Sequence, residues 1–452
     1  MWTECCDAGS RTERRIRAKK RRTGPVCRRS QVTRGLTLAE KIISRASGQE
    51  VRAGDLAVVR VGMAMSVDSI APSVIKVMRQ ELGVPHVADP KRVALFVDHV
   101  APACNISTAE GQAEVRRFVR EEGIAHFYDV GTGVCHQVMI EHGLARPGEV
   151  VVGSDSHSTS YGAIGAFGTG MGATGIALAF ATGKIWLRVP ESLRVDLVGS
   201  LPAGVMSKDA VLQLIGRLGI DGATYMSVEV HGAHTLSLAS RISFVCMTTE
   251  LGAKAGMVAF PRQLLDQRGM PDWLFPDEDA VYARSETIQL DGLEPQVACP
   301  DDVDNVHPVS EVAGTRIDQV FLGTCTNGRL EDLQAAARML RGRRVSSQVR
   351  MIVIPASDTV LRDAVGDGTL ATLLDAGATV GTPGCGPCIG RHMGVLAAGE
   401  ACFSTGNRNF RGRMGSPEAD IYIGSPLTAA ATALTGVITD PREVMPNKAA
   451  HR

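Results

Sequence analysis

Residues 381–394 have the sequence GTPGCGPCIGRHMG, in which Cys385 and Cys388 form a C-x-x-C motif among glycine and proline. Two thiols at this spacing act as a redox dithiol, bind part of a structural zinc site, or bind part of an iron–sulfur cluster. A closed zinc site needs four ligands, and the sequence contains no second C-x-x-C motif. The motif alone leaves these possibilities open.

A third cysteine makes a cluster possible. Cys325 lies in LGTCTNGRLEDL (322–333), at the end of a strand predicted over 317–325. Three cysteine ligands would leave one iron of a four-iron cluster without a protein ligand, and an open iron is a Lewis acid toward hydroxyl and carboxylate groups. The alternative is that the C-x-x-C motif is a tight turn and that Cys325 belongs to the core.

The composition indicates a large α/β enzyme. The chain has 452 residues, of which 44% are hydrophobic, only 4% are aromatic, and 49 are glycine. This length predicts two or three domains, with cores of aliphatic side chains and many tight strand-to-helix turns. The formal net charge is zero, so no global field favours nucleic acid or an anionic membrane. No run of about 18 apolar residues is present to span a bilayer.

Strand and helix patterns alternate along the chain. A first helix is predicted over 36–48 and an apolar helix over 176–187. Strands are predicted within 92–100, 148–157, 194–201, 317–325, 349–357 and 419–426. This alternation is typical of parallel sheets covered by helices. We place the domain boundaries near 190 and 310, which gives domains over 35–190, 191–310 and 311–452.

Polar residues of catalytic type follow the predicted strands. They are Asp98–His99, Asp155–Ser156–His157, Cys325 and Cys385, and His136 lies in DVGTGVCHQ (129–137). Functional groups gather at the carboxyl ends of parallel strands. A carboxylate beside an imidazole raises its basicity and fixes its tautomer, which suits general acid catalysis. A histidine of this kind taken alone is more often a structural residue, but together they favour a site.

Two glycine-rich segments carry less information. STGNRNFRGRMGS (404–416) contains Arg408, Arg411 and Arg413, whose guanidinium groups suit carboxylates bidentately. The alternative is a solvated basic loop. GAFGTGMGATG (165–175) partly matches a dinucleotide-binding pattern, but a single match is weak, and a turn that lets a helix pack close to a sheet explains it better.

Residues 1–34 differ from the rest, with eleven Lys or Arg against three acidic residues. We expect this basic extension to be disordered. It arises from a start site placed too far upstream, or it is a transit peptide or a basic binding arm. No apolar signal segment is present and the cysteines show no disulfide framework, so we expect a reducing, cytoplasmic location.

The motifs together resemble the aconitase superfamily, and within it the large subunits of two-subunit enzymes such as 3-isopropylmalate dehydratase and homoaconitase. The resemblance covers roughly residues 36–440. It rests on VDHVAP (97–102), GTGVCHQ (131–137), GSDSHSTSYGAIGAFGTGMG (153–172), GTCTNGRLEDL (323–333), GTPGCGPCIG (381–390) and STGNRNFRGRMG (404–415). Six motifs in this order make the match very specific.

The resemblance implies three α/β/α domains around a [4Fe–4S] cluster, with the mobile fourth domain absent from this chain. Cys325, Cys385 and Cys388 would hold the cluster and leave one iron open to substrate. The positions that match active-site motifs are Asp98, His99, His136, Asp155, Ser156, His157 and Glu250. Arg408 and Arg413 match the arginines that bind substrate carboxylates.

The implied activity is that of a hydro-lyase that dehydrates or isomerises a hydroxy-dicarboxylic or hydroxy-tricarboxylic acid. His99, paired with Asp98, would protonate the leaving hydroxyl. The catalytic base would be a serine of a separate small subunit, which would also determine much of the substrate selectivity. The first expectation is 3-isopropylmalate dehydratase of leucine biosynthesis. The alternatives are homoaconitase and 2,3-dimethylmalate dehydratase.

Two departures from the family pattern stand out. Cys246, in RISFVCMTTELGAK (241–254), stands where the family usually has asparagine beside the cluster, and Val67 stands where relatives often have glutamine or histidine. A thiol is a poorer hydrogen-bond partner than an amide. These departures motivate an alternative of another class, a binding protein without a cluster; an RNA-binding apo-protein is a further alternative, supported only by the basic extension.

Overall fold

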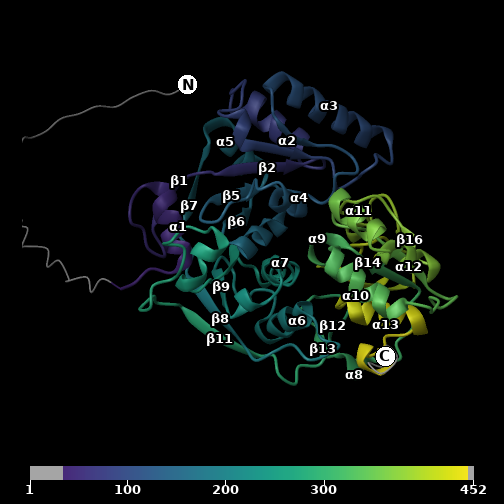
Figure 1. Ribbon diagram of the computed structural model, residues 1–452. Helices are drawn as coiled ribbons and strands as arrows, with labels where there is room; N and C mark the ends of the chain where they lie inside the picture. The colour runs from purple at the N-terminus through teal and green to yellow at the C-terminus, as the bar shows by residue number, and fades with distance from the viewer. Residues whose placement is uncertain (1–33, 446–452) are drawn as a thin grey trace, which may run out of the picture. The chain divides into compact units, whose positions relative to one another are not determined.

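The computed structural model describes residues 34–445, and Figure 1 shows its helices and strands. The predicted basic extension lies outside the described residues except for Arg34. From Gly35 onward the described chain forms one compact unit. Its first helix, α1 (Leu38–Ser47), confirms the helix predicted at 36–48, since Thr37 caps its N-terminus and Gly48 ends it in the left-handed conformation.

The first sheet has five parallel strands in the order β4-β3-β2-β5-β6. They are β2 (Met63–Val67), β3 (Val93–Phe96), β4 (His126–Tyr128), β5 (Val150–Gly153) and β6 (Phe167–Gly170). Strands β2, β3 and β5 are buried along their whole length, as expected of a parallel sheet covered on both faces. Its helices are α2 (Ala71–Lys76), α3 (Ile106–Glu122), α4 (Cys135–Glu141) and α5 (Ala173–Thr182).

The second sheet has four parallel strands in the order β10-β9-β8-β11. They are β8 (Ser192–Val198), β9 (Ser227–His231), β10 (Ala255–Val258) and β11 (Arg284–Gln289). Helix α6 (Ser207–Leu218) connects β8 to β9, and α7 (Leu238–Met247) connects β9 to β10. Both helices are largely buried, so this sheet also follows the predicted strand–helix alternation.

The third sheet has seven strands in the order β13-β12-β18-β17-β14-β15-β16. They are β12 (Gln296–Ala298), β13 (Val306–Pro308), β14 (Gln319–Leu322), β15 (Arg350–Val353), β16 (Thr379–Val380), β17 (Ala401–Ser404) and β18 (Asp420–Ile423). Around them pack α10 (Leu330–Leu340), α11 (Asp358–Gly366), α12 (Thr369–Asp375) and α13 (Pro426–Thr435). The prediction of a parallel sheet is wrong at one edge, because β12 runs antiparallel to β13 and β18.

A two-stranded antiparallel ribbon contradicts a second prediction. It pairs β1 (Leu56–Arg60) with β7 (Lys184–Arg188). The helix predicted over 176–187 is wrong beyond Thr182, because α5 ends there, Gly183 adopts a φ of 67°, and the next residues form β7. A short apolar run fits a buried helix or a strand equally well.

Helix α7 connects the sheets at their shared junction. It packs against the 3-10 segment η3 (Ser156–Ile164), which follows β5, and against α9 (Thr324–Asn327), which follows β14. A Cβ atom at Gly162 in η3 would overlap the carbonyl oxygen of Gly256 in β10, so glycine permits this close approach. The strand ends of the first and third sheets therefore meet beside α7.

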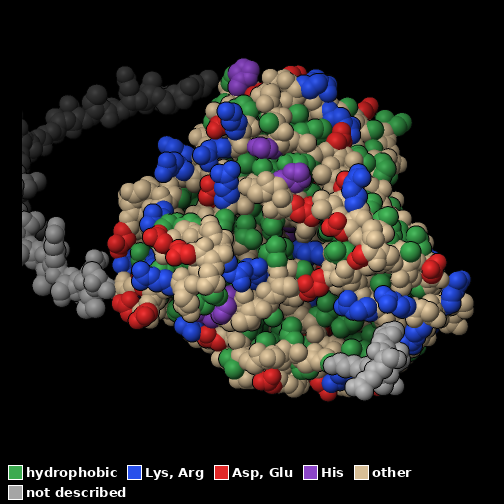
Figure 2. Space-filling model, viewed as in Figure 1, with side chains coloured by type: hydrophobic (Ala, Val, Ile, Leu, Met, Phe, Trp, Pro, Cys, Tyr) green, Lys and Arg blue, Asp and Glu red, His purple; other side chains and the backbone are tan. Residues whose placement is uncertain are grey.

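The three sheets span 63–170, 192–289 and 296–423. The division into three domains with boundaries near 190 and 310 stays a prediction, since the chain after Arg34 forms a single compact unit. No described helix is long and apolar enough to cross a membrane. Figure 2 shows basic and acidic side chains interspersed over the visible face.

Candidate active site

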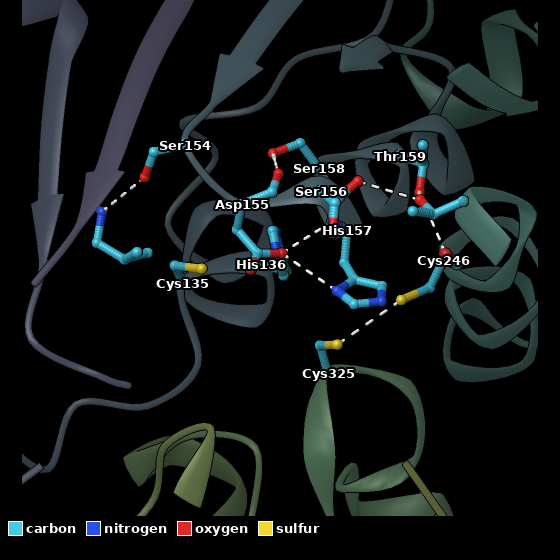
Figure 3. A network of polar contacts seen from close by, with 12 residues as sticks. Cys135, His136, Ser154, Asp155, Ser156, His157, Ser158, Thr159, Cys246 and Cys325 are labelled. Atoms are coloured by element: carbon cyan, nitrogen blue, oxygen red, sulfur yellow. Dashed lines mark hydrogen bonds and ion pairs between the residues drawn. The ribbon is translucent and has the colours of Figure 1, made fainter. Parts of the chain in front are cut away.

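Three histidines surround the carboxylate of Asp155, and Figure 3 shows two of them, His136 and His157. Asp155 follows β5, and its Oδ1 lies 2.8 Å from His136 Nε2 and 3.2 Å from His157 Nδ1. Its Oδ2 lies 3.4 Å from His99 Nε2. Burial alone would raise the pKa of Asp155, but hydrogen bonds from the histidines hold it well below its usual value. Asp155 is therefore a stable carboxylate that orients the three rings.

His99 lies between two carboxylates. Its Nδ1 is 2.8 Å from Asp98 Oδ1, and the Asp98 Oδ2 accepts a hydrogen bond from the backbone N–H of Cys135 at 2.8 Å. Burial alone would lower the pKa of His99, but Asp98 and Asp155 raise it well above its usual value. This pairing maintains an imidazolium at neutral pH, which can donate a proton.

His157, Glu250 and Arg408 form a second chain of contacts. His157 Nε2 lies 2.9 Å from Glu250 Oε1. Arg408 Nε donates to both Glu250 oxygens at 3.1 and 3.0 Å, and its Nη2 donates to Ser156 Oγ at 2.9 Å. Burial alone would lower the pKa of His157, but Cys325, Asp155 and Glu250 raise it to about 10. The contacts orient the Arg408 guanidinium rigidly.

The three predicted cluster cysteines come from two loops of the third sheet. Cys325 is in α9 (Thr324–Asn327) after β14. After β16, Cys385 directly precedes the 3-10 turn η8 (Gly386–Ile389), and Cys388 lies within that turn. The neighbouring Cys388 sulfur, burial and Cys325 raise the pKa of the Cys385 thiol well above its usual value. The thiol of Cys385 therefore senses both of the other two cysteines.

Hydrogen-bond donors face these sulfurs. Asn407 Nδ2 lies 3.2 Å from Cys325 Sγ, and Arg413 Nη2 lies 3.7 Å from Cys388 Sγ. Cys385 and Arg413 lower the pKa of Cys388 well below its usual value. The Nε of Arg413 is buried and has no hydrogen-bond partner within residues 34–445. The surroundings of Cys388 thus favour a thiolate, and Arg413 keeps one donor for an anion.

The backbone before Cys325 is strained. Thr324 has a φ of 79°, which is rare for a β-branched residue and costs about 1–3 kcal/mol. Its side chain accepts a hydrogen bond from the N–H of Thr326 at 3.1 Å and donates to the carbonyl oxygen of Thr405 at 3.3 Å. Strain of this kind persists where neighbouring contacts fix a functional side chain.

A cavity of about 540 Å³ joins the histidines and the arginines. Its lining includes His99, Asp155, Ser156, His157, Arg391, Arg408 and Arg413, with Val67, Ile70, Ile389 and Phe410 as apolar neighbours. His136 and Glu250 do not line this cavity; they are buried and contact its lining residues Asp155 and His157. Arg411 points elsewhere, with its Nε 2.7 Å from Asp301 Oδ2 on the surface.

The sequence reasoning missed two buried residues of this region. Lys208, at the start of α6, is fully buried, and its Nζ donates to the carbonyl oxygens of Thr405 and Gly406 at 2.6 and 2.5 Å. Asn407 contacts Cys325, although the loop was noted only for its arginines. The one available signal was the position of Asn407 beside Arg408. Nothing local indicates that Lys208 is buried.

Comparisons with known proteins find clear relatives of this chain. The aconitase family (aconitate hydratase) matches residues 61–436. The homoaconitase large subunit of Thermus thermophilus is 58% identical over 413 residues, covering 91% of this chain and 98% of that protein. The 3-isopropylmalate dehydratase large subunit 1 of Deinococcus radiodurans is 54% identical over 417 residues, covering 92% of this chain and 95% of that protein.

A solved structure shares the fold. Aconitase X of Thermococcus kodakaraensis, in its holo form, superposes with a TM-score of 0.51 at 14% identity, over 84% of this chain and 90% of that one. At this identity the likeness concerns the fold alone.

Proposed function

This chain belongs to the aconitase family, and we propose that it is the cluster-bearing large subunit of a two-subunit hydro-lyase. The substrate is a hydroxy acid with at least two carboxylates. The relatives bear the names of a homoaconitase and a 3-isopropylmalate dehydratase, and we propose 3-isopropylmalate as the first substrate, with homoaconitate as the alternative. The observation that carries the proposal is that His99, paired with Asp98, lies in one cavity with Arg408 and Arg413.

The donor set fits a [4Fe–4S] cluster held by Cys325, Cys385 and Cys388. Cys388 and Cys325 both raise the pKa of Cys385, and Asn407 and Arg413 direct N–H groups at two of the sulfurs. Such donors stabilise cluster thiolates. When bound through three cysteines, the cluster supplies an open iron, which acts as a Lewis acid toward hydroxyl and carboxylate oxygens.

The protein's own groups bind and protonate the substrate. Arg408, fixed by Glu250 and Ser156, presents its remaining N–H groups to one carboxylate, and the unpartnered Nε of Arg413 offers a further donor. His99 donates the proton that the leaving hydroxyl needs to depart as water. Asp98 then stabilises the ring's Nδ1–H, so the proton leaves from Nε2.

The proton on the neighbouring carbon needs a base. The three histidines around Asp155 contact its carboxylate. This contact suits them to donate a proton rather than to remove one from carbon. We propose that a separate small subunit supplies this base, and that the base is a serine. The names of the relatives support a small subunit, because both are called large subunits. We also propose a cytoplasmic location, because all cysteines within residues 34–445 are free thiols.

The test is anaerobic purification of the chain, alone and with candidate small subunits, followed by iron and sulfide analysis and EPR. We expect a three-iron signal that disappears when ferrous iron is added, and turnover of 3-isopropylmalate or homoaconitate only with the small subunit present. Zinc in place of iron, or full turnover by the chain alone, would contradict the proposal. Comparison of the two substrates and of 2,3-dimethylmalate identifies the reaction.

A further inference from the structure

Two buried thiols meet at the junction of the sheets, and the mechanism above uses only one of them. Cys246, in α7, has its Sγ 3.7 Å from the Sγ of Cys325, in α9. Figure 3 shows the two sulfur atoms directed at each other across the gap between their segments. The residues are 79 positions apart in the sequence, so this contact depends on the docking of the second sheet onto the third.

The contact is fixed from several sides. Asn407 Nδ2 lies 3.2 Å from Cys325 Sγ and 3.7 Å from Cys246 Sγ. Thr326 Oγ1 lies 3.7 Å from Cys246 Sγ and 4.0 Å from Cys325 Sγ. On the far side, the Thr159 hydroxyl donates to the Cys246 carbonyl oxygen at 3.2 Å. These contacts hold the sulfurs in van der Waals contact, whereas a disulfide needs a separation of about 2.05 Å.

We propose that Cys246 and Cys325 form a reversible disulfide when the cluster is lost in the presence of peroxide. The proposal rests on the proposed function, because it takes Cys325 to be a cluster ligand. Cys325 is 7% exposed and Cys246 is 0% exposed, so the oxidant reaches Cys325 first. The sulfurs must approach by roughly 1.7 Å to form the bond.

The reaction has two steps. The Cys325 sulfur attacks hydrogen peroxide, the O–O bond breaks, and one oxygen leaves as water while the other remains as a sulfenic acid. The Cys246 sulfur then attacks the Cys325 sulfur, the S–O bond breaks, and the sulfenic oxygen leaves as a second water. The two thiols lose two electrons and two protons in total, and one peroxide is reduced to two waters. A dithiol reverses the reaction.

This pairing changes the fate of Cys325. The C-x-x-C thiols Cys385 and Cys388 can oxidise to a disulfide with each other, which leaves Cys325 as the odd ligand. Without a partner, a sulfenic acid proceeds to the irreversible sulfinic and sulfonic acids. With Cys246 beside it, Cys325 is stored as a disulfide that cannot bind iron until it is reduced. Cluster uptake would then depend on a reductant.

The test uses the full chain after removal of its cluster with a chelator, and a peroxide titration. Trypsin should release Cys246 in peptide 242–254, Cys325 in peptide 317–329, and Cys385 with Cys388 in peptide 363–391. After blocking of free thiols, we expect peptides 242–254 and 317–329 to appear linked, about 2 Da below the sum of their masses. A dithiol should separate them and restore iron uptake.

Cys246→Ser and Cys246→Ala are the test variants, and Cys402→Ser, which changes a buried thiol in β17, is the matched control. In the Cys246 variants we expect peptide 317–329 to gain about 32 Da as the sulfinic acid and iron uptake to stay lost after reduction. The Cys402 variant should behave as the wild type. The proposal is overturned if wild-type Cys325 over-oxidises as in the variants, or links to Cys385 or Cys388 instead.

The peptide masses separate this proposal from the proposed function. A linked pair in a chain that never accepts iron would refute the cluster but support the disulfide. A chain that binds the cluster and yields only over-oxidised Cys325 would support the function and refute the disulfide. If serine at position 246 prevents folding, the mapping of the wild-type chain alone decides the result.

Discussion

Replacement of Asp98 by asparagine should weaken the acid that the structure builds at His99. The Asp98 carboxylate accepts from the Cys135 N–H with one oxygen and contacts His99 Nδ1 with the other, at 2.8 Å in each case. Asparagine has a single oxygen, and the Cys135 N–H requires an acceptor inside the protein. The amide NH₂ group therefore faces His99 Nδ1, which must then accept a hydrogen bond instead of carrying a proton.

The size of the effect follows from the bond that is lost. A hydrogen bond to a charged group contributes about 1.5–3 kcal/mol, which corresponds to a loss of about 10- to 150-fold in rate. The loss should depend on pH. Asp98 raises the pKa of His99 well above its usual value against the effect of burial, so the wild-type ring stays protonated at neutral pH. The variant's ring deprotonates at lower pH, and its defect grows as the pH rises.

The assay is the pH dependence of kcat with the cluster-loaded chain and its small subunit. Asp68→Asn is the matched control, because buried Asp68 accepts from the backbone N–H groups of His99 and Val100, at 3.0 and 3.2 Å, and makes no hydrogen bond to the ring. We expect this control to lower stability and to change kcat equally at every pH. The reasoning fails if the Asp98 variant loses activity equally at all pH values, or if the control shifts the pH profile in the same way.

Three further variants test other parts of the structure. Lys208→Met leaves the carbonyl oxygen of Gly406 without its donor and that of Thr405 with only the Thr324 hydroxyl, at a cost of about 1–3 kcal/mol for the unsatisfied group, so the thermal midpoint should fall; an unchanged midpoint would contradict this burial. Arg408→Lys loses the guanidinium fork and should raise KM more than it lowers kcat; a change in kcat alone would assign Arg408 another role. Burial raises the pKa of Asp209 to about 7, whereas the unfolded group ionises near pH 4. The wild type should lose stability relative to Asp209→Asn as the pH rises from about 4 to 7, and parallel melting curves across that range would refute the shift.

The parallel strands were predictable because their pattern is local. The strands predicted within 92–100, 148–157 and 317–325 correspond to β3, β5 and β14. Each combines a short run of buried β-branched or aromatic residues with a polar or glycine-rich end. Because such ends share one edge of a sheet, the meeting of Asp98–His99 with Asp155 could be expected from the chain order alone.

The errors in the fold have a common cause. Strands β12 and β13 have three residues each, and β7 continues an apolar run that also contains a helix. In short segments the sheet context rather than the local sequence selects the structure. Only the contact with a neighbouring strand distinguishes β7 from a last helical turn, and the sequence pattern does not contain that contact.

The same limit applies to the site. Cys246 could be singled out as a departure from the family pattern, but its contact with Cys325 depends on the packing of α7 against α9. In the sequence, Lys208 is an ordinary lysine at the start of a helix, for which exposure to solvent is expected. In the structure, the loop after β17 covers it and accepts its hydrogen bonds. Long-range packing fixes both residues, so hydrophobic periodicity carries no signal for them.

The charge states in the cavity depend on residues from different sheets, and this links the fold to the chemistry. His157 follows β5. Burial alone would lower its pKa, but Cys325, Asp155 and Glu250 raise it to about 10. Of these residues, Cys325 follows β14 and Glu250 follows α7. Arg408, after β17, is oriented by that same Glu250. Separation of any one sheet would remove a charge partner from the other two. The acid and the carboxylate-binding groups therefore exist as a set only when all three sheets are docked.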